Sequence, residues 1–355
     1  MCLRRVVRKY VRDARIRTPD DVDYLRVYCT RKNSIWKCRQ MGLSEKSELR
    51  DDRHHSSDSR LLLIGLDAGS VGDLEQQLTS LQCSFDHAAG SADALRQLRE
   101  IPYPVVITDP NTSIREDLAL VDEIWRVRPG VRLILLAPSG TPEDLIAVLR
   151  RRVFLCQVAP FNATEIARYA ASAMEADNSN LGIEVLSADR DWISVRMNSD
   201  LLNADRLTAF FRQFQMTMPE RPPGEMMVAF EEILQNAIEH GAQNDPSKLL
   251  EIAAVRTARA FVFYISDPGK GFHPDALPHA AISYPPEHMT GHIEIRKRSG
   301  MRPGGYGILI ASGIVDEMIY SEVGNEVLLI KHKAGSEPRR QSSHEETRVP
   351  SRVDD

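Results

Sequence analysis

Short apolar runs alternate with amphipathic stretches over residues 61–176. Five of the runs predict strands, at 61–66, 83–88, 104–109, 132–137 and 153–158. Between them, apolar residues recur at helical spacing, which predicts helices near 71–82, 91–100, 114–127, 141–150 and 163–175. Strands that alternate with helices are typical of parallel βαβ units. This part of the chain is therefore expected to form a doubly wound parallel (βα)5 domain.

A different pattern follows the short polar linker at 176–182. A leading strand pair is predicted at 183–188 and 192–198, and an amphipathic helix at 204–216. Further strands are predicted at 249–255, 261–267 and 326–333, with helical segments between them. Residues 180–333 are therefore expected to form a second α/β domain, a mixed sheet covered on one side by helices.

The segment before Gly241 predicts a helix with one apolar and one polar face. At about 100° per residue, with Glu232 at 0°, Asn236 falls near 40° and His240 near 80°, opposite the apolar face. Pro222 and Pro223 suit the start of such a helix and Gly241 its end. Taken alone, this is an ordinary amphipathic surface helix. His240 fits a hydrogen-bonding partner as well as it fits a functional group.

Two glycine-containing segments follow that helix in the sequence. Asp267-Pro-Gly-Lys-Gly271-Phe comes after a predicted strand, and Gly304-Gly305-Tyr-Gly307 opens a helical run over 308–318. Each is common by itself. Their order after an E-x-x-x-N helix is far more specific. The set resembles the ATP-binding fold shared by histidine kinases, gyrase and the Hsp90 chaperones, and most closely the anti-sigma-factor serine kinases.

The resemblance, which covers about 150 of the 355 residues, implies ATP and Mg²⁺ as ligands. In that family Asn236 would give an amide oxygen to Mg²⁺, and Glu232 would be the catalytic general base; an exposed helix carboxylate is the alternative for Glu232. Asp267 would accept a hydrogen bond from the adenine amino group. The remaining positions are expected to let the backbone approach the base, sugar and phosphates: Gly269, Gly271, Gly305 and Gly307.

Residues 272–303 would form a lid over the nucleotide. Arg298 is expected to bind the phosphates, and a solvated basic stretch is the alternative. The other cations of this stretch are Arg296, Lys297 and Arg302.

The first domain resembles a response-regulator receiver domain. That family accepts a phosphoryl group on a carboxylate at the end of the third strand, where Asp109 stands; a helix cap or loop residue is the alternative. The other family positions differ here: Gly65 and Leu66 replace an acidic Mg²⁺-binding pair, with Asp67 beyond, Ala137 replaces a hydroxyl, and Val158-Ala159 replaces a lysine before Pro160. A degenerate receiver that serves interaction or dimerisation is therefore expected, with Asp109 as a weak phosphoacceptor candidate.

Charge is distributed unevenly along the chain. Residues 1–60 carry 16 Lys and Arg against 9 Asp and Glu, a net charge of +7. Because the whole chain has a net charge of −5, residues 61–355 carry −12. This stretch is expected to be a disordered basic leader and linker, with Met41 as an alternative start, and 334–355 a disordered tail. His54-His55 is a weak metal candidate. Five scattered cysteines and no long apolar run favour a cytoplasmic protein without disulfides or membrane spans.

Several function classes compete. A transmitter histidine kinase needs a hairpin with a phosphoacceptor histidine, but residues 176–225 contain no histidine. The chain ends about 22 residues after the last predicted strand, which disfavours gyrase-like and chaperone-like enzymes. The expectation is an ATP-dependent serine/threonine protein kinase of the anti-sigma-factor type. Its partners would be an anti-sigma antagonist-like protein and a sigma factor. The rival is a non-catalytic ATP-binding switch; DNA binding by the leader is a weaker third, and a homodimer stays open.

Overall fold

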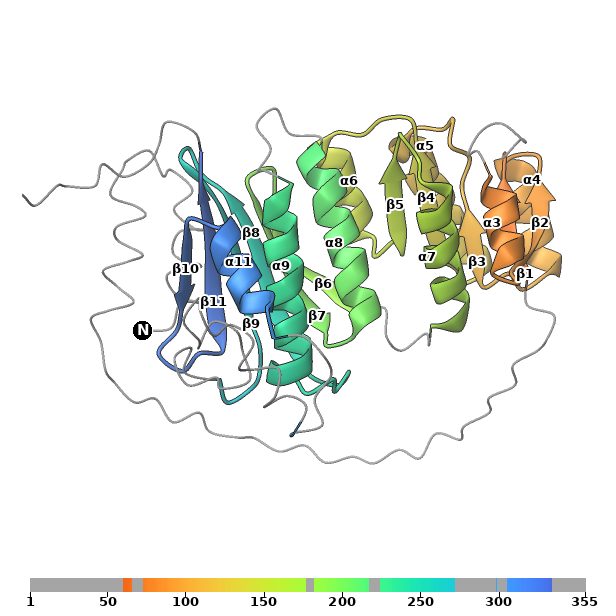
Figure 1. Cartoon of the computed structure of the whole chain (residues 1–355). Helices are drawn as coiled ribbons and strands as arrows, with labels where there is room; N and C mark the ends of the chain where they lie inside the picture. Colours follow the sequence, from red (N-terminus) through yellow and green to blue (C-terminus); the bar gives the residue numbers. More distant parts are fainter. Residues whose placement is uncertain are drawn as a thin grey trace, which may run out of the picture.

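The computed structural model describes residues 60–65, 73–176, 182–216, 224–271, 298 and 305–333. Two domains follow one another along the chain (Figure 1). The N-terminal domain is a parallel sheet with strand order β2-β1-β3-β4-β5. Its strands are β1 (Arg60–Ile64), β2 (Ser84–Ala88), β3 (Val105–Ile107), β4 (Arg132–Ala137) and β5 (Leu155–Val158). Its helices are α3 (Leu74–Ser80), α4 (Ser91–Glu100), α5 (Ile114–Val127), α6 (Pro142–Arg150) and α7 (Ala163–Glu175). The predicted doubly wound (βα)5 architecture is confirmed.

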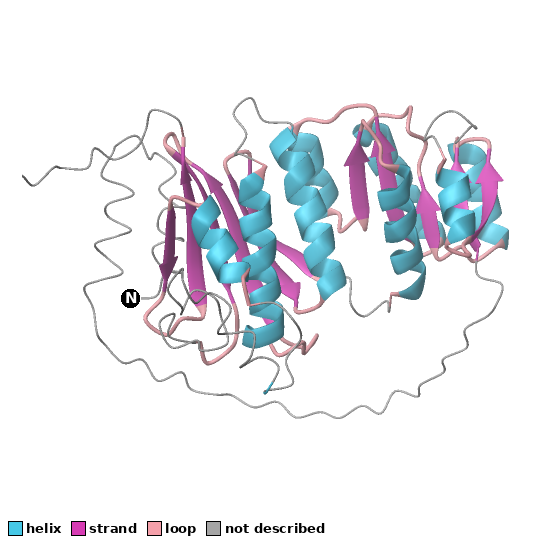
Figure 2. Ribbon diagram, in the orientation of Figure 1, coloured by secondary structure: helices cyan, strands magenta, loops and turns pink. Residues whose placement is uncertain are grey.

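The C-terminal domain is a six-stranded sheet of order β10-β11-β9-β8-β7-β6. Its strands are β6 (Ile183–Asp189), β7 (Trp192–Asn198), β8 (Leu249–Arg256), β9 (Ala260–Ser266), β10 (Glu317–Tyr320) and β11 (Glu326–His332). Its helices are α8 (Leu201–Met216), α9 (Glu225–Asn236) with the π-helical turn η2 (Ala237–Gly241), and α11 (Gly307–Ile314). Helices α8, α9 and α11 lie on one side of the sheet (Figure 2). An α/β sandwich is therefore confirmed.

Two details of the second domain differ from the sequence prediction. Every strand pair in this sheet is antiparallel, so the expected mixed sheet is wrong. The helix predicted over 308–318 ends at Ile314, and Glu317–Tyr320 forms strand β10 against β11. Helical periodicity in this apolar run was overridden by strand pairing, because short apolar segments fit either structure.

Side chains at the helix starts explain several boundaries. Ser113 and Thr141 each cap their helix through a reciprocal capping box, with Glu116 at the start of α5 and Asp144 at the start of α6. Such a box satisfies N–H groups that a helix start leaves without an internal partner. These two helices therefore begin where a serine or threonine precedes an acidic residue by three positions.

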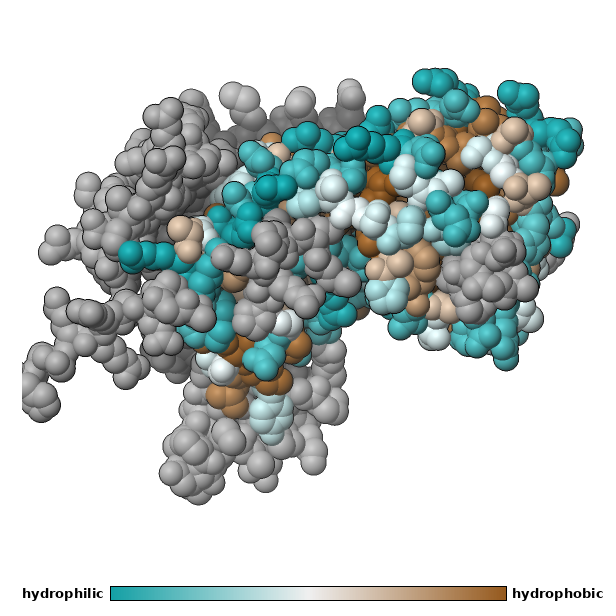
Figure 3. Space-filling view, turned by 90° about the horizontal axis from the view of Figure 1, so that it is seen from above, coloured by the Kyte–Doolittle hydropathy of each residue, from teal (hydrophilic) through white to brown (hydrophobic). Residues whose placement is uncertain are grey.

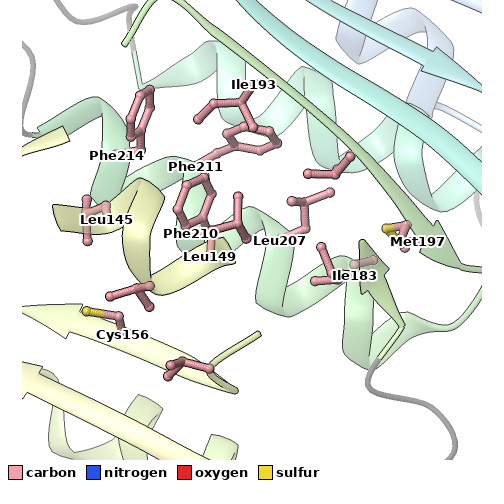
Figure 4. Close-up of a cluster of buried hydrophobic side chains, with 14 of the residues drawn as sticks. Leu145, Leu149, Cys156, Ile183, Ile193, Met197, Leu207, Phe210, Phe211 and Phe214 are labelled. Carbon is pink, nitrogen blue, oxygen red and sulfur yellow. The ribbon is translucent and has the colours of Figure 1, made fainter. Parts of the chain in front are cut away.

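The hydrophobic core is continuous between the two domains. Phe210 and Leu207 on α8 lie in one buried cluster with Leu145 and Leu149 on α6 and with Cys156 on β5 (Figure 4). The same cluster continues onto the inner face of the second sheet through aromatic contacts. The ring centroids of Phe211 and Phe230 are 5.5 Å apart, and those of Phe230 and Phe263 are 4.5 Å apart. Burial of this area favours a fixed arrangement of the two domains.

Polar groups of α8 satisfy the free edge of β5. Arg206, which is 5% exposed, donates from Nε to the carbonyl of Phe154 at 2.8 Å, and its guanidinium lies 4.4 Å from that ring. The Gln213 side-chain oxygen accepts from the backbone N–H of Val158 at 3.1 Å. An edge strand otherwise exposes such groups for pairing with other chains. Helix α8 thus occupies one of the two edges at which the first sheet could add a strand.

The surface agrees with the composition. Hydrophilic residues predominate over the visible described surface in Figure 3, and apolar groups form separate patches. Cys83 and Cys156 are free, buried thiols, as expected for the described cysteines. None of the described helices combines the length and hydropathy required to cross a bilayer. The leader, the tail, His54-His55 and Asp67 lie outside the described residues.

Candidate functional site

A large cavity opens between α9, η2, α11 and the end of β9. Its volume is about 850 Å³, within the range of small-ligand sites. All three motif segments meet in its wall. The predicted site residues that line it are Glu232, Asn236, Asp267, Gly269, Gly271, Gly305 and Gly307.

The start of α11 lies directly against the polar face of α9. A Cβ atom added to Gly307 would lie 2.6 Å from the Glu232 carboxylate and 3.3 Å from the Asn236 amide nitrogen. No side chain of the described residues caps α11. Its first N–H groups therefore point to the same region as a carboxylate and a carboxamide. A helix start with N–H groups available favours an anionic ligand.

The Asp267 segment lies against the end of η2. A Cβ atom on Gly269 would be 2.6 Å from the carbonyl oxygen of Gly241, and one on Gly241 would be 2.2 Å from the carboxyl carbon of Asp267. The backbones can approach this closely only because both positions are glycine. The π-helical turn brings Gly241 to this contact, and such turns are frequent at functional sites.

Asn325 holds the Asp267 segment in place, a role that the sequence reasoning missed. Its side-chain N–H groups donate to the backbone carbonyls of Asp267 at 3.2 Å and Gly269 at 3.5 Å, and its backbone carbonyl accepts from the Asp267 N–H at 3.0 Å. Gly271 has φ of +75° and would bring a Cβ within 1.9 Å of the Val323 carbonyl. A lone asparagine in a turn gives little sequence signal.

Two lysines of the cavity wall were also missed. Lys248 and Lys270 both line the cavity. Lys248 donates to the carbonyl of Ala242 at 3.0 Å and so ties the end of η2 to the start of β8. Both therefore add positive charge to the wall of the cavity. Lys248 lies outside the glycine-containing segments, and Lys270 lies inside one, between Gly269 and Gly271, but the motif gave it no role of its own.

Burial is the main influence on the pKa of the Asp267 carboxyl group. Desolvation raises its pKa, the N–H of Gly269 at 2.7 Å lowers it, and the nearby charge of Glu326 raises it, with a net upward direction. An acceptor with limited access to water discriminates strongly between ligands that do and do not donate to it. This environment suits recognition of an amino group.

The predicted lid, 272–303, lies outside the described residues except at Arg298, and so do its cations Arg296, Lys297 and Arg302. Gly304 of the second glycine segment also lies outside them. Arg298 is described and exposed. It does not belong to the described lining of the cavity. Its phosphate-binding role stays a prediction.

In the first domain, Asp109 follows β3 as predicted. Its carboxylate accepts from the backbone N–H and the side-chain amide of Asn111 at 2.9 and 3.0 Å. Gly65, with φ of +61°, lies so close that an added Cβ would be 2.2 Å from the Asp109 carboxylate. No cluster of three or more His, Cys, Asp or Glu suited to a metal exists in the described part of the chain. Phosphorylation of Asp109 stays a prediction.

Asp117 is a buried carboxyl group beside Asp109. It accepts hydrogen bonds from Thr108 and Thr112, each at 2.7 Å, and is 2% exposed. Desolvation raises its pKa to about 6, although both hydroxyls oppose the rise. The folded state therefore binds this proton more tightly than the unfolded chain, whose aspartates titrate near pH ~4.

This shift predicts a specific pH dependence of stability. The stabilising contribution of protonated Asp117 is complete below about pH 4 and is lost as pH rises through about 6, by about 3 kcal/mol. In Asp117→Asn this loss should disappear, as measured by urea unfolding at pH 4.5 and pH 7.5. Asp122→Asn, at an exposed ion pair with Arg151, should keep the wild-type slope. Equal slopes in Asp117→Asn and wild type would contradict the assignment.

Comparisons with known proteins agree with this architecture. Residues 197–331 match the family described as histidine kinase-like ATPase domain. The chain is 29% identical over 117 residues to the transcriptional regulatory proteins GlrR of Escherichia coli K12 and QseF of Escherichia coli O157:H7. Those matches cover 33% of this chain and 26% of each relative, so the chain spans about a quarter of their length.

Solved structures give further matches at low identity. A response regulator receiver domain protein from Clostridium thermocellum is 20% identical, with 33% of this chain and 94% of that chain covered and a TM-score of 0.29. A CheY-like receiver domain protein from Methanospirillum hungatei JF-1 is 16% identical, with 33% and 94% covered and a TM-score of 0.30.

A receiver-like domain thus precedes residues that match the histidine kinase-like ATPase domain, and that match implies ATP binding in signalling.

Proposed function

We propose that this chain is an ATP-dependent serine/threonine protein kinase of the anti-sigma-factor type. It would transfer the γ-phosphoryl group of ATP to a hydroxyl of an antagonist-like partner protein, with a sigma factor as a second, sequestered partner. The receiver-like domain would serve as an interaction module. The proposal goes beyond the ATP binding that the second domain implies.

The single observation that supports it best is the placement of Glu232. Its carboxylate lies in the cavity wall beside Gly307 at the start of α11 and one helical turn from Asn236. A base is thus available where the terminal phosphate of a bound nucleotide would lie. Lys248 and Lys270 add positive charge to the same wall.

The chemical step follows from these positions. Glu232 takes the proton from the partner's serine or threonine hydroxyl, and that oxygen forms a bond to the γ-phosphorus. The bond from the γ-phosphorus to the bridging oxygen breaks, and ADP leaves with the electron pair. The carboxamide oxygen of Asn236 fits a hard cation, and Mg²⁺ there would neutralise phosphate charge. Asp267 and the glycines hold the adenosine.

The second candidate is a non-catalytic switch that binds ATP and sequesters partners. The burial of α8 against the receiver-like domain favours it, because a change at the nucleotide could pass through α9 and α8 to the other domain. In that case the nucleotide changes partner affinity without being consumed.

Phosphotransfer separates the two candidates. The full chain is incubated with γ-labelled ATP, Mg²⁺ and an antagonist-like protein, and ATP binding is measured by calorimetry in parallel. The expected result is label on the partner that survives acid, as phosphoserine and phosphothreonine do. Acid-labile label would overturn the proposal in favour of histidine or aspartate phosphorylation. Binding without any transfer would establish the switch, and absence of binding would overturn both candidates.

A further inference from the structure

The second sheet has an apolar outer face, on the side away from its helices. Across three strands, Ala253 pairs with Tyr264, Tyr264 with Leu328, and Val262 with Ile330. We call this set the outer-face cluster. Its buried members are Ala253, Ala260, Val262, Tyr264, Leu328 and Ile330, with Trp192, Val255 and Ile319 packed against them.

This cluster is buried although no described helix contributes to it. Leu328 and Ile330 are 0% exposed, and Val262 is 8% exposed. The cluster has members only from strands, while α8, α9 and α11 pack into the core on the other face. The Trp192 indole N–H is buried without a hydrogen-bond partner. A sheet face of this kind needs a cover, because apolar patches of this extent are rarely left to water.

The segments outside the described residues differ in their ability to provide that cover. Residues 334–355 follow β11 directly but are mainly polar, with Val349 and Val353 as their only aliphatic side chains beyond Ala334. Residues 272–304 are tied at both ends to the rim of the nucleotide cavity, at Gly271 and Gly305. The segment before β1 is long: the 47 residues 13–59 alone span about 155 Å when extended, enough to bring residues 1–12 to the second sheet.

The start of that segment has the pattern of an amphipathic helix. Its apolar side chains stand at spacings of three and four residues, on one side of a helix: Leu3, Val6, Val7, Tyr10 and Val11. Its cations fill the opposite side: Arg4, Arg5, Arg8, Lys9 and Arg12. Such a stripe is wide enough to lie on a flat apolar sheet while the cations stay in water.

We propose that residues 1–12 dock as an amphipathic helix on the outer-face cluster. The sheet is then sandwiched between α8, α9 and α11 on one face and the leader on the other. The leader thereby joins the N-terminal end of the chain to the ATPase domain rather than to nucleic acid. The proposal does not depend on catalysis or on nucleotide.

Trp192 reports on the cover directly. The double variant Trp36→Phe/Trp125→Phe leaves it as the single tryptophan of the full chain. In this background, Val7→Glu/Tyr10→Glu should raise acrylamide quenching of Trp192 at least threefold and shift its emission to longer wavelength. The matched control Arg5→Glu/Lys9→Glu adds the same number of carboxylates to the opposite side and should leave quenching unchanged.

Other occupants give different results. Unchanged quenching in Val7→Glu/Tyr10→Glu overturns the proposal. Quenching of the parent protein that rises on dilution, with a matching loss of dimer in light scattering, assigns the face to a second copy and also overturns it. Binding of the leader to vesicles of anionic phospholipid without any change in Trp192 quenching would assign the stripe to a membrane surface instead.

Discussion

Gly269→Ala should lower the affinity for ATP at least a hundredfold while leaving the receiver-like domain folded. The added Cβ would lie 2.6 Å from the Gly241 carbonyl oxygen and 2.9 Å from its Cα, both rigid backbone atoms. Neither can move as a flexible side chain would. The Asp267 segment must therefore separate from η2, which displaces the carboxyl group expected to read adenine. A hundredfold loss corresponds to about 2.7 kcal/mol.

Gly313→Ala is the matched control for this change. Gly313 lies within α11, in the same domain, and an added Cβ would have no atom within 4 Å. Alanine in a helix interior is about 1 kcal/mol more favourable than glycine, so this variant should be slightly more stable and bind ATP normally. Isothermal titration calorimetry measures affinity, and circular dichroism checks the fold. Near-normal ATP affinity in folded Gly269→Ala would separate the Asp267 segment from nucleotide recognition.

The sequence predicted which segments line one cavity better than it predicted the pairing of the sheet around that cavity. The motif residues Glu232, Asn236 and Asp267 were identifiable because each lies in a local pattern whose order is specific. Asn325 and Lys248 were not, since their roles arise from contacts with backbone groups far away in sequence. A local sequence pattern identifies residues that act within that pattern, but it does not show which distant backbone segment the side-chain amide of a residue such as Asn325 will bind.

The boundaries show the same limit. The first two residues of β10, Glu317 and Met318, were assigned to a helix because they continue the helical pattern of α11. The true partner of β10, β11, supplies hydrogen bonds that periodicity cannot represent. The packing of α8 against α6 and β5, which joins the two domains, could not be predicted from the sequence either. A buried arginine such as Arg206 reads as a solvated helix residue until the Phe154 carbonyl is placed beside it.

That joint bears on how the domains communicate. The edge of β5 is covered by α8, and α8 in turn packs on α9, which carries Glu232 and Asn236. Packed side chains of α8 and α9 therefore lie between the receiver-like domain and the cavity, whether or not Asp109 is ever phosphorylated. Coupling of this kind requires two arrangements of the joint with different nucleotide affinity.

Glu232→Gln should separate catalysis from binding, the second large effect expected of the site. Removal of a general base lowers the rate of transfer by about 10²- to 10⁴-fold, whereas the neutral amide keeps the shape of the cavity wall. ATP affinity should stay within about threefold, equivalent to ~0.7 kcal/mol. Asn236→Ala should behave differently, because it removes an oxygen ligand and should weaken ATP binding mainly when Mg²⁺ is present.

Glu231→Gln is the control on the same helix. The Glu231 carboxylate pairs with Arg212 and lies outside the described lining of the cavity, so its loss should change neither binding nor transfer. Single-turnover transfer to a partner and calorimetry with and without Mg²⁺ give the two readouts. If Glu232→Gln transfers phosphate at the wild-type rate, another group must accept the proton. If Glu232→Gln weakens ATP binding as severely as Asn236→Ala does, the Glu232 carboxylate is a ligand of the metal rather than the base. Loss of a metal ligand lowers both ATP affinity and transfer, whereas loss of a base lowers transfer alone.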